Sequence, residues 1–154
     1  MPEHTSKRRV RHSASDMFDL VADMQKYPQF VPLCTSLRIK SRTEKAPGVS
    51  VVVASMTVAY KMIQQTFVTR DTLDKPNLKI VVEYLDGPFS HLRNMWSFRP
   101  TGEHSCEVEF YIDYEFKSRM LAMVMGAMFD TAFRKFATAF EARADKIYGR
   151  PKTA

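Results

Sequence analysis

Hydrophobic positions recur with a helical period near the start of the chain. They are spaced i, i+3, i+4 and i+7, which places on one face of a helix Met17, Leu20, Val21 and Met24. Ser13 precedes this run and is the expected helix N-cap. A short, charged strand is expected before the helix, at about residues 4–12. Pro28 and Pro32 break any long helix after it, so only a second, short helix is expected there.

From residue 35 to residue 117 the pattern changes to strict alternation. The clearest case is CEVEFYIDYEF, where apolar Val108, Phe110 and Ile112 alternate with charged or polar neighbours, as in a half-buried antiparallel strand. Strong turn signals separate this strand from about five earlier ones, at Ala46-Pro47-Gly48, Lys75-Pro76-Asn77, Asp86-Gly87-Pro88 and Pro100-Thr101-Gly102. The outward carboxylates of this last strand are expected to be a solvated face rather than a metal site.

The last periodic segment, residues 118–148, predicts one helix of about 45 Å at 1.5 Å per residue. Its apolar stripe consists of Leu121, Met125, Met128, Phe129, Ala132, Phe136, Phe140 and Ile147. Strands grouped together, with helices segregated from them, indicate an α+β fold. We therefore expect one domain over residues 1–154, with its core at about 5–149. Its curved antiparallel sheet would have about seven strands and grip the long C-terminal helix.

Composition and charge limit the classes of protein only a little. The chain has 154 residues and a net charge of +6, which suits a ribosome or an anionic membrane but also plain solubility. Cys34 and Cys106 have no metal-ligand spacing, so we expect two buried free thiols in a reducing compartment. No secretory signal and no apolar stretch of about 18 residues occurs, so we expect a cytoplasmic protein, with peripheral contact at the membrane's inner face as a further option.

The familiar catalytic motifs are missing from the sequence. The four histidines, His4, His12, His91 and His104, are expected near strand ends or turns, at the surface. The inward face of the sheet is predicted to be almost wholly apolar. Its few polar members would be Asn94, one of Gln64 or Gln65, and Arg8. No inward carboxylate or histidine is expected, which argues against an enzyme. Whether sheet and helix pack solidly or leave a cavity stays open at this point.

Four segments together resemble a known family. MFDLVADMQKYPQFVPLC, DGPFSHLRNMWSF, CEVEFYIDYEF and AFEARADKIYG are similar, in this order, to START-like coenzyme Q-binding proteins and ribosome association toxins. This family lies within the wider polyketide cyclase and lipid-transport group. The resemblance covers about residues 5–149. One departure is Leu33, where the family often has Trp, and it affects the expected shape of the pocket near that residue.

The resemblance implies a helix-grip (START/Bet v 1-like) fold with a deep apolar cavity between sheet and C-terminal helix. It implies a non-enzymatic carrier or chaperone for ubiquinone or another polyprenyl lipid, serving respiration or quinone biosynthesis. No cofactor would be required, and DNA is not an expected partner. The cavity-lining residues expected on this basis are Phe30, Leu33, Phe67, Tyr84, Phe89, Asn94, Trp96, Phe110, Ile112, Met125, Met128, Phe129 and Phe136.

Two alternatives remain beside the carrier. The ribosome-binding branch of the family is favoured by two groups of basic residues, which are Arg38, Lys40 and Arg42 in the sheet and Lys7, Arg8, Arg9 and Arg11 near the N-terminus. A cyclase or dehydratase is the weaker alternative, because no acid or base is expected inside.

The linker YPQFVPLC, Tyr27 to Cys34, is unusually apolar. Phe30 and Leu33 could gate the cavity and touch a membrane there, or they could simply plug the end of the core.

Overall fold

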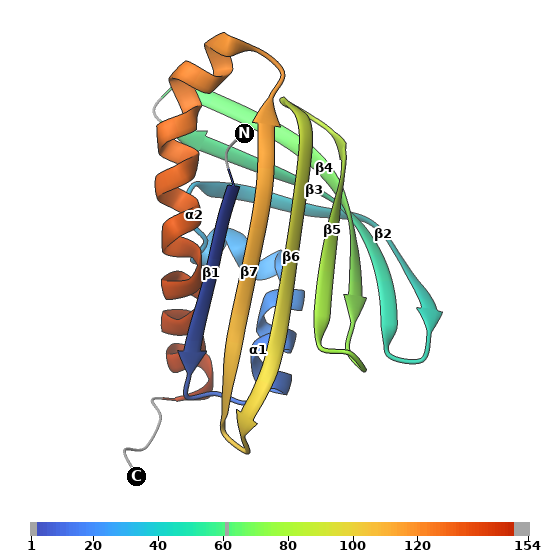
Figure 1. Ribbon diagram of the computed structural model, residues 1–154. Coiled ribbons are helices and arrows are strands. Elements are labelled where there is room, and N and C mark those ends of the chain that lie inside the picture. Colours follow the sequence, from blue (N-terminus) through green and yellow to red (C-terminus); the bar gives the residue numbers. More distant parts are fainter. Residues whose placement is uncertain (1–2, 61, 150–154) are drawn as a thin grey trace.

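The computed structural model describes residues 3–60 and 62–149 (Figure 1). These described residues form seven strands, two α-helices and one 3₁₀ helix. Their order is β1 Glu3–Val10, α1 Ala14–Ala22, η1 Met24–Gln29, β2 Cys34–Ala46, β3 Val49–Tyr60, β4 Ile63–Asp74, β5 Lys79–Asp86, β6 Phe89–Gly102, β7 Ser105–Phe116 and α2 Arg119–Tyr148.

The strands form one antiparallel sheet in the order β1-β7-β6-β5-β4-β3-β2. In Figure 1 the sheet curls away from β1, which lies beside α2, until β2, β3 and β4 cross behind the helix. One long helix therefore lies in the hollow of a strongly curved sheet. This is the helix-grip arrangement that the sequence predicts, including the two short helices after the first strand.

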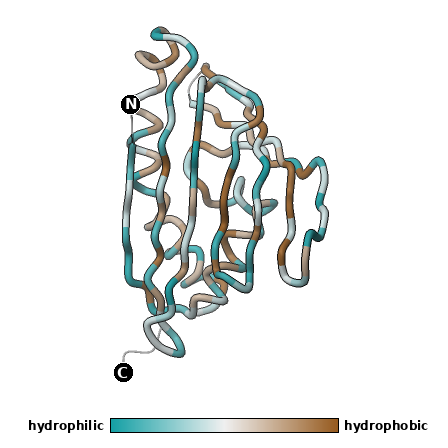
Figure 2. The backbone as a smooth tube through the Cα atoms, turned by 45° about the vertical axis from the view of Figure 1, so that its right-hand side comes forward, coloured by the Kyte–Doolittle hydropathy of each residue, from teal (hydrophilic) through white to brown (hydrophobic). Residues whose placement is uncertain are grey.

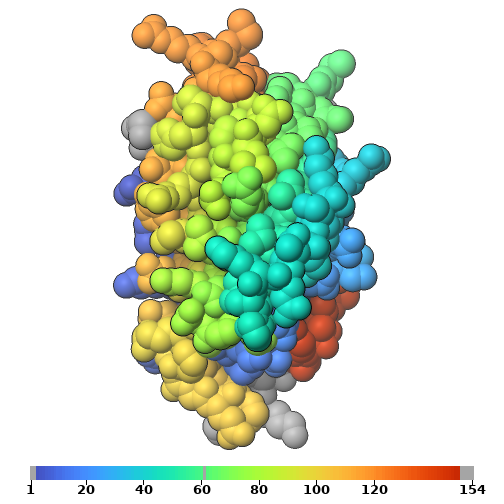
Figure 3. All heavy atoms as spheres, turned by 90° about the vertical axis from the view of Figure 1, so that its right-hand side faces the viewer, coloured from blue at the N-terminus to red at the C-terminus, as the bar shows by residue number. Residues whose placement is uncertain are grey.

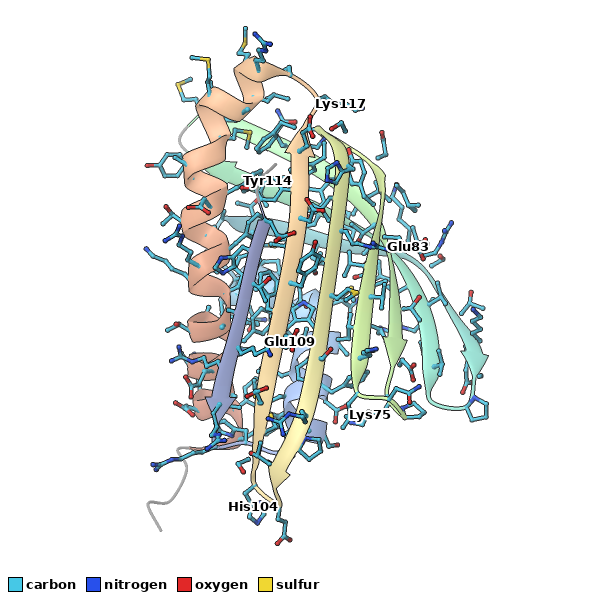
Figure 4. All side chains as sticks on the ribbon, in the orientation of Figure 1. Lys75, Glu83, His104, Glu109, Tyr114 and Lys117 are labelled. Carbon is cyan, nitrogen blue, oxygen red and sulfur yellow. The ribbon has the colours of Figure 1, made fainter. Side chains whose placement is uncertain are left out.

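Alternation along β7 builds the core as predicted. Cys106, Val108, Phe110, Ile112, Tyr114 and Phe116 are all buried, while the residues between them are exposed or half-buried. Figure 4 shows Tyr114 on the α2 side of β7, and its ring lies 5.2 Å from that of Phe133. The far edge of the sheet differs from β7, because most residues of edge strand β2 are exposed. Figure 2 shows that β2 is largely hydrophilic, whereas the neighbouring β3 is largely hydrophobic.

Side-chain caps fix where both α-helices begin. The Ser13 hydroxyl accepts a hydrogen bond from the Asp16 backbone N–H at 3.0 Å, which confirms the predicted cap of α1. Ser118 does the same for the Leu121 N–H at 3.1 Å at the start of α2. Ile147, expected on the buried stripe of α2, is instead 48% exposed in the last turn of the helix.

Polar contacts fasten α2 to the rest of the fold at its C-terminal end. Arg8 Nε donates to Glu141 Oε1 at 2.6 Å, and His12 Nε2 lies 2.7 Å from Asp145 Oδ1. Two more contacts, Arg143–Gln29 and Tyr148–Asp16, lie in the same stretch. The polar contacts found earlier in α2 are local, as in Leu121–Ser118, Thr131–Ala127 and Arg134–Asp130. Apolar packing, which includes Met125 as well as the phenylalanines, is therefore the main contact of its first two thirds with the sheet.

Candidate ligand cavity

A cavity of about 100 Å³ lies between the sheet, α2 and the linker that precedes β2. Its wall on the α2 side comes from the middle of the helix, Phe129 to Phe140. Strands β2 to β7 supply the opposite wall, and Val31, Pro32 and Leu33 of the linker close one side. The choice between a solid core and a cavity, which the sequence pattern leaves open, is thus resolved in favour of a cavity.

Nine of the thirteen residues expected to contact a ligand line this cavity. They are Leu33, Phe67, Phe89, Asn94, Trp96, Phe110, Ile112, Phe129 and Phe136. The wall they form is tightly packed at its centre, since the Trp96 ring lies 4.8 Å from that of Phe110 and 5.0 Å from that of Phe140. Contact of these residues with a ligand stays a prediction.

The other four expected residues lie outside the cavity lining. Phe30 instead packs edge-on against Phe140 at 5.1 Å, with the Arg143 guanidinium 5.1 Å above its ring. The Tyr84 hydroxyl accepts a hydrogen bond from the Phe89 backbone N–H at 3.0 Å. Met125 and Met128 precede the part of α2 that faces the cavity. The spacing of apolar residues in the sequence places both methionines on the apolar face of α2. Which helical turns of that face line the cavity depends on how α2 docks against the sheet.

Most of the polar residues expected inside are elsewhere. Arg8 pairs with Glu141 at the surface, Gln64 is exposed, and half-buried Gln65 is outside the lining. Asn94 does line the cavity, and its Nδ2 donates to the Tyr111 backbone oxygen at 2.8 Å. That bond uses an amide hydrogen to satisfy a neighbouring strand, so the amide has less to donate to a ligand.

The prediction that no carboxylate faces inward is wrong. Asp71 lines the cavity with only 7% of its surface exposed, and its Oδ1 atom has no hydrogen-bond partner among the described residues. Burial raises the pKa of this carboxyl to about 6, and the nearby Thr69 hydroxyl opposes the shift. The sequence does contain the signal, because Thr69 and Asp71 are in phase with inward-facing Phe67 and Leu73 on β4.

The rest of the lining cannot neutralise this carboxyl. No lysine, arginine or histidine lines the cavity among the described residues. Tyr27 lines it and is neutral, since burial, followed by the charge of Asp71, raises the pKa of its phenol. The described residues also hold no group of three or more His, Cys, Asp or Glu side chains that could bind a metal.

The two cysteines play no part in this chemistry. Both are buried free thiols, as predicted, and burial raises the pKa of each to about 11. A thiol that stays protonated at neutral pH is a poor nucleophile and a poor metal ligand. Cys34 and Cys106 are therefore ordinary core residues.

Apolar side chains are exposed at the end of the molecule where α2 begins. Met62 at the β3–β4 turn is 100% exposed, and Met120 and Met123 in α2 are 74% and 84% exposed. Figure 3 shows side chains of these two segments protruding from the same end. Lys117, which Figure 4 places at the β7–α2 connection, adds a positive charge there. No helix of the described chain is both long enough and apolar enough to span a bilayer.

A second surface feature is the basic edge of the sheet. Arg38, Lys40 and Arg42 on edge strand β2 are exposed, and none of them has an acidic partner within 4 Å among the described residues. Some cations elsewhere on the sheet are paired, as in Arg70–Glu83 on β4 and β5. Arg9, Lys79 and Arg93 on other strands are exposed and, among the described residues, have no acidic partner within 4 Å either. What distinguishes β2 is that three such cations alternate along one edge strand.

Comparison with known proteins gives consistent results. The family described as polyketide cyclase/dehydrase and lipid transport matches residues 10–141. "Ribosome association toxin RatA" of Escherichia coli is 36% identical over 96% of this chain and 90% of its own. "Coenzyme Q-binding protein COQ10 homolog B, mitochondrial" of Xenopus laevis is 29% identical over 96% of this chain and 60% of its own. The solution structure of the 18 kDa protein CC1736 from Caulobacter crescentus is 35% identical, with a TM-score of 0.78, and the match covers 97% of this chain and 99% of that one.

Proposed function

Because the chain belongs to the polyketide cyclase/dehydrase and lipid transport family, we propose that it binds ubiquinone or a related polyprenyl lipid in the cavity and carries it without converting it. The observation that carries this proposal is the cavity itself, enclosed by aromatic and aliphatic side chains beneath α2. Pockets for small ligands are mostly apolar with a few placed polar groups, and this lining has that composition. The name of the Xenopus relative agrees with the ligand class.

The energetics suit a carrier rather than a tight receptor. Each buried CH₂ group gains about 0.8 kcal/mol when it leaves water. A prenyl tail that comes from a bilayer is already dry, so most of this gain cancels. Affinity then depends on the fit of the ring and on a few polar contacts. Uptake from a membrane and release to a partner, such as a respiratory or quinone-biosynthesis enzyme, are therefore nearly balanced.

Cavity size limits what this conformation can hold. At about 100 Å³ the cavity is somewhat smaller than an engineered cavity of about 150 Å³ that binds benzene. A ring can therefore enter with little expansion, whereas a prenyl tail needs much more room. The first two thirds of α2 is held mainly by apolar packing, whereas Arg8–Glu141 and His12–Asp145 fasten its C-terminal end. We infer that binding the tail displaces the first two thirds of the helix.

The exposed methionines suggest where the lipid enters. We infer that Met62, Met120 and Met123 insert into the surface of an anionic bilayer, with Lys117 and Arg119 beside them at the headgroups. A protruding apolar end fits a fluid bilayer better than a preformed protein groove. This places the membrane contact at the start of α2 rather than at the Phe30 linker. The protein would then act at the inner face of the cytoplasmic membrane.

Vesicle flotation tests the membrane contact. The wild type is expected to float with vesicles of phosphatidylcholine and phosphatidylglycerol, and the double variant Met120→Ser/Met123→Ser is expected to float several-fold less. Ile147→Ser is the matched control, since it removes an exposed apolar side chain at the opposite end of the same helix. Equal flotation of all three proteins would rule out this end as the contact.

Lipid content tests the main proposal. The protein purified from its own host is extracted with organic solvent, and the extract is analysed for quinones by mass spectrometry. In parallel, a short-chain ubiquinone is added to the stripped protein. Its binding is followed through Trp96, which lines the cavity and is the sole tryptophan of the sequence. Recovery of a quinone together with saturable quenching is expected. If the extract contains no quinone and added ubiquinone causes no quenching, the proposal is refuted.

Ribosome binding is a second candidate, favoured by the basic edge strand. The name of the Escherichia coli relative and the unpaired charges of Arg38, Lys40 and Arg42 both point to it. Lysine and arginine also protect edge strands from aggregation, so the charges alone do not distinguish the two roles. Co-sedimentation with large ribosomal subunits should fall steeply with salt if phosphates are contacted. The variant Arg38→Ala/Lys40→Ala/Arg42→Ala should co-sediment less than the wild type. If the wild type does not co-sediment even at low salt, ribosome binding is ruled out.

An enzymatic role stays the weakest candidate. Asp71 does supply one acid or base group inside the cavity, contrary to the expectation from the sequence. Its polar neighbours in the lining are Thr69, Tyr27 and Asn94, and none of these is charged at neutral pH. A cyclase needs a second group to move the proton that Asp71 takes. Turnover of a polyketide-like substrate by the purified protein would overturn this judgement.

A further inference from the structure

The unpartnered oxygen of Asp71 calls for an explanation that the fold does not supply. The residue lies in the wall of an apolar cavity with only 7% of its surface exposed, and Oδ1 has no hydrogen-bond partner among the described residues. Buried polar atoms without a partner are rare, because each one costs free energy. A buried carboxylate oxygen without a partner in a cavity wall indicates a candidate ligand-binding site.

We propose that Asp71, with Thr69 beside it, forms a polar subsite that accepts a hydrogen bond from the hydroxyl group of a phenol or hydroquinone headgroup. This rests on the proposed lipid-binding function and narrows its ligand class. The apolar wall holds the ring and the first part of the tail, and Asp71 selects headgroups that carry a hydrogen-bond donor. A fully oxidised quinone has carbonyl oxygens but no such donor.

The polar atoms of the lining favour a donor on the ligand. An ionised carboxylate can only accept hydrogen bonds, and at neutral pH most of Asp71 is ionised, since its pKa is about 6. Asn94 already gives an amide hydrogen to the Tyr111 backbone oxygen, and its own Oδ1 is a second acceptor. A carbonyl oxygen placed against these two acceptors would find little to bind. A hydroxyl group would find a charged acceptor in a dry site, where such bonds are strongest.

The groups around Asp71 leave its charge uncompensated. On its own strand, Thr69 supplies a neutral hydroxyl. Its register partners on the neighbouring strands are Val52 of β3 and Val82 of β5, which are apolar. From η1, Tyr27 feels the charge of Asp71 and stays protonated. With no cation in the described lining, a hydroxyl donor from the ligand is the available partner.

Two matched probes test this subsite: 4-heptylphenol and its methyl ether, 4-heptylanisole. The two probes have the same ring and the same tail. In the ether a methyl group replaces the hydroxyl hydrogen, so the ether cannot donate a hydrogen bond. Binding to the wild type at pH 8 is measured by Trp96 fluorescence, and the ratio of the two affinities is compared with the ratio in Asp71→Leu. A hydrogen bond to a charged group is worth enough that the phenol-to-ether ratio should be about tenfold or more higher in the wild type.

Two further variants complete the test. Asp71→Asn keeps the shape and an acceptor oxygen but not the charge, so its ratio should fall between those of the wild type and Asp71→Leu. It also serves if the leucine variant fails to fold. Asp86→Asn changes an exposed carboxylate at the β5–β6 turn and should leave the ratio unchanged. If both probes bind with the same ratio in the wild type and the Asp71 variants, the subsite is wrong while lipid binding stands. If neither probe binds the wild type, the proposed function itself fails.

Discussion

Replacing Asp71 by asparagine should stabilise the protein, by an amount that depends on pH. Burial raises the pKa of this carboxyl from 3.8 to about 6 in the folded state. The folded state therefore holds the proton more tightly than the unfolded state. As pH rises from about 4 to about 6, the unfolded chain ionises first and the folded protein loses stability. Above pH 6 the loss levels off.

The size of the effect follows from the pKa values. Each pKa unit corresponds to about 1.4 kcal/mol, so the ionised carboxyl costs the folded state up to about 3 kcal/mol at pH 7 or above. Asparagine has nearly the same shape and does not ionise, so Asp71→Asn removes this cost. For a chain of 154 residues, 3 kcal/mol corresponds to an increase in Tm of about 6–12 °C.

Urea unfolding of both proteins from pH 4 to pH 8 measures the effect. The difference in unfolding free energy should be near zero at pH 4, grow between pH 4 and pH 6, and then stay constant. Asp86→Asn, which changes an exposed carboxylate, should show no such profile. A difference that is independent of pH, or an asparagine variant less stable at pH 7, would refute the argument that Asp71 is a buried, unpaired carboxyl.

Two further predictions concern the wall of the cavity. Gly87 has φ +144°, and a Cβ there would lie 2.5 Å from the Phe67 Cβ, so Gly87→Ala should lower the free energy of unfolding by about 2 kcal/mol or more. Gly126 lies in open space on α2, so Gly126→Ala should raise it by about 0.5–1 kcal/mol. Thermal unfolding measures both variants, and similar values for the two would contradict the close packing at Gly87. Phe30→Ser should lower the unfolding free energy by about 2 kcal/mol because it removes the ring contact with the helix, while Leu33→Ser should weaken lipid binding more than stability. Equal loss of binding and stability in both variants would show that Leu33 also plugs the core.

The sequence predicts the sheet and its cover well, because strict alternation and side-chain caps are local signals. Ser13 and the alternating residues of β7 behave as expected for this reason. The interior of the cavity is harder to predict. Asp71 escapes the prediction because a charged residue is expected to face solvent, although its phase on β4 places it inside. Met125 and Met128 share the helical stripe with Phe129, but the empty volume depends on how α2 docks, and spacing cannot report that.

The pairing of β1 with β7 has a consequence for how the chain assembles. Strands β2 to β7 each pair with the next along the chain, so they can form as successive local hairpins. β1 is made first, yet its partner comes about a hundred residues later, when Val10 pairs with Cys106. Contacts so distant in sequence form late and slowly. During synthesis the apolar hollow of the sheet thus stays uncovered until α2 emerges, and we expect the addition of edge strand β1 to β7 and the docking of α2 to come after the hairpins have formed.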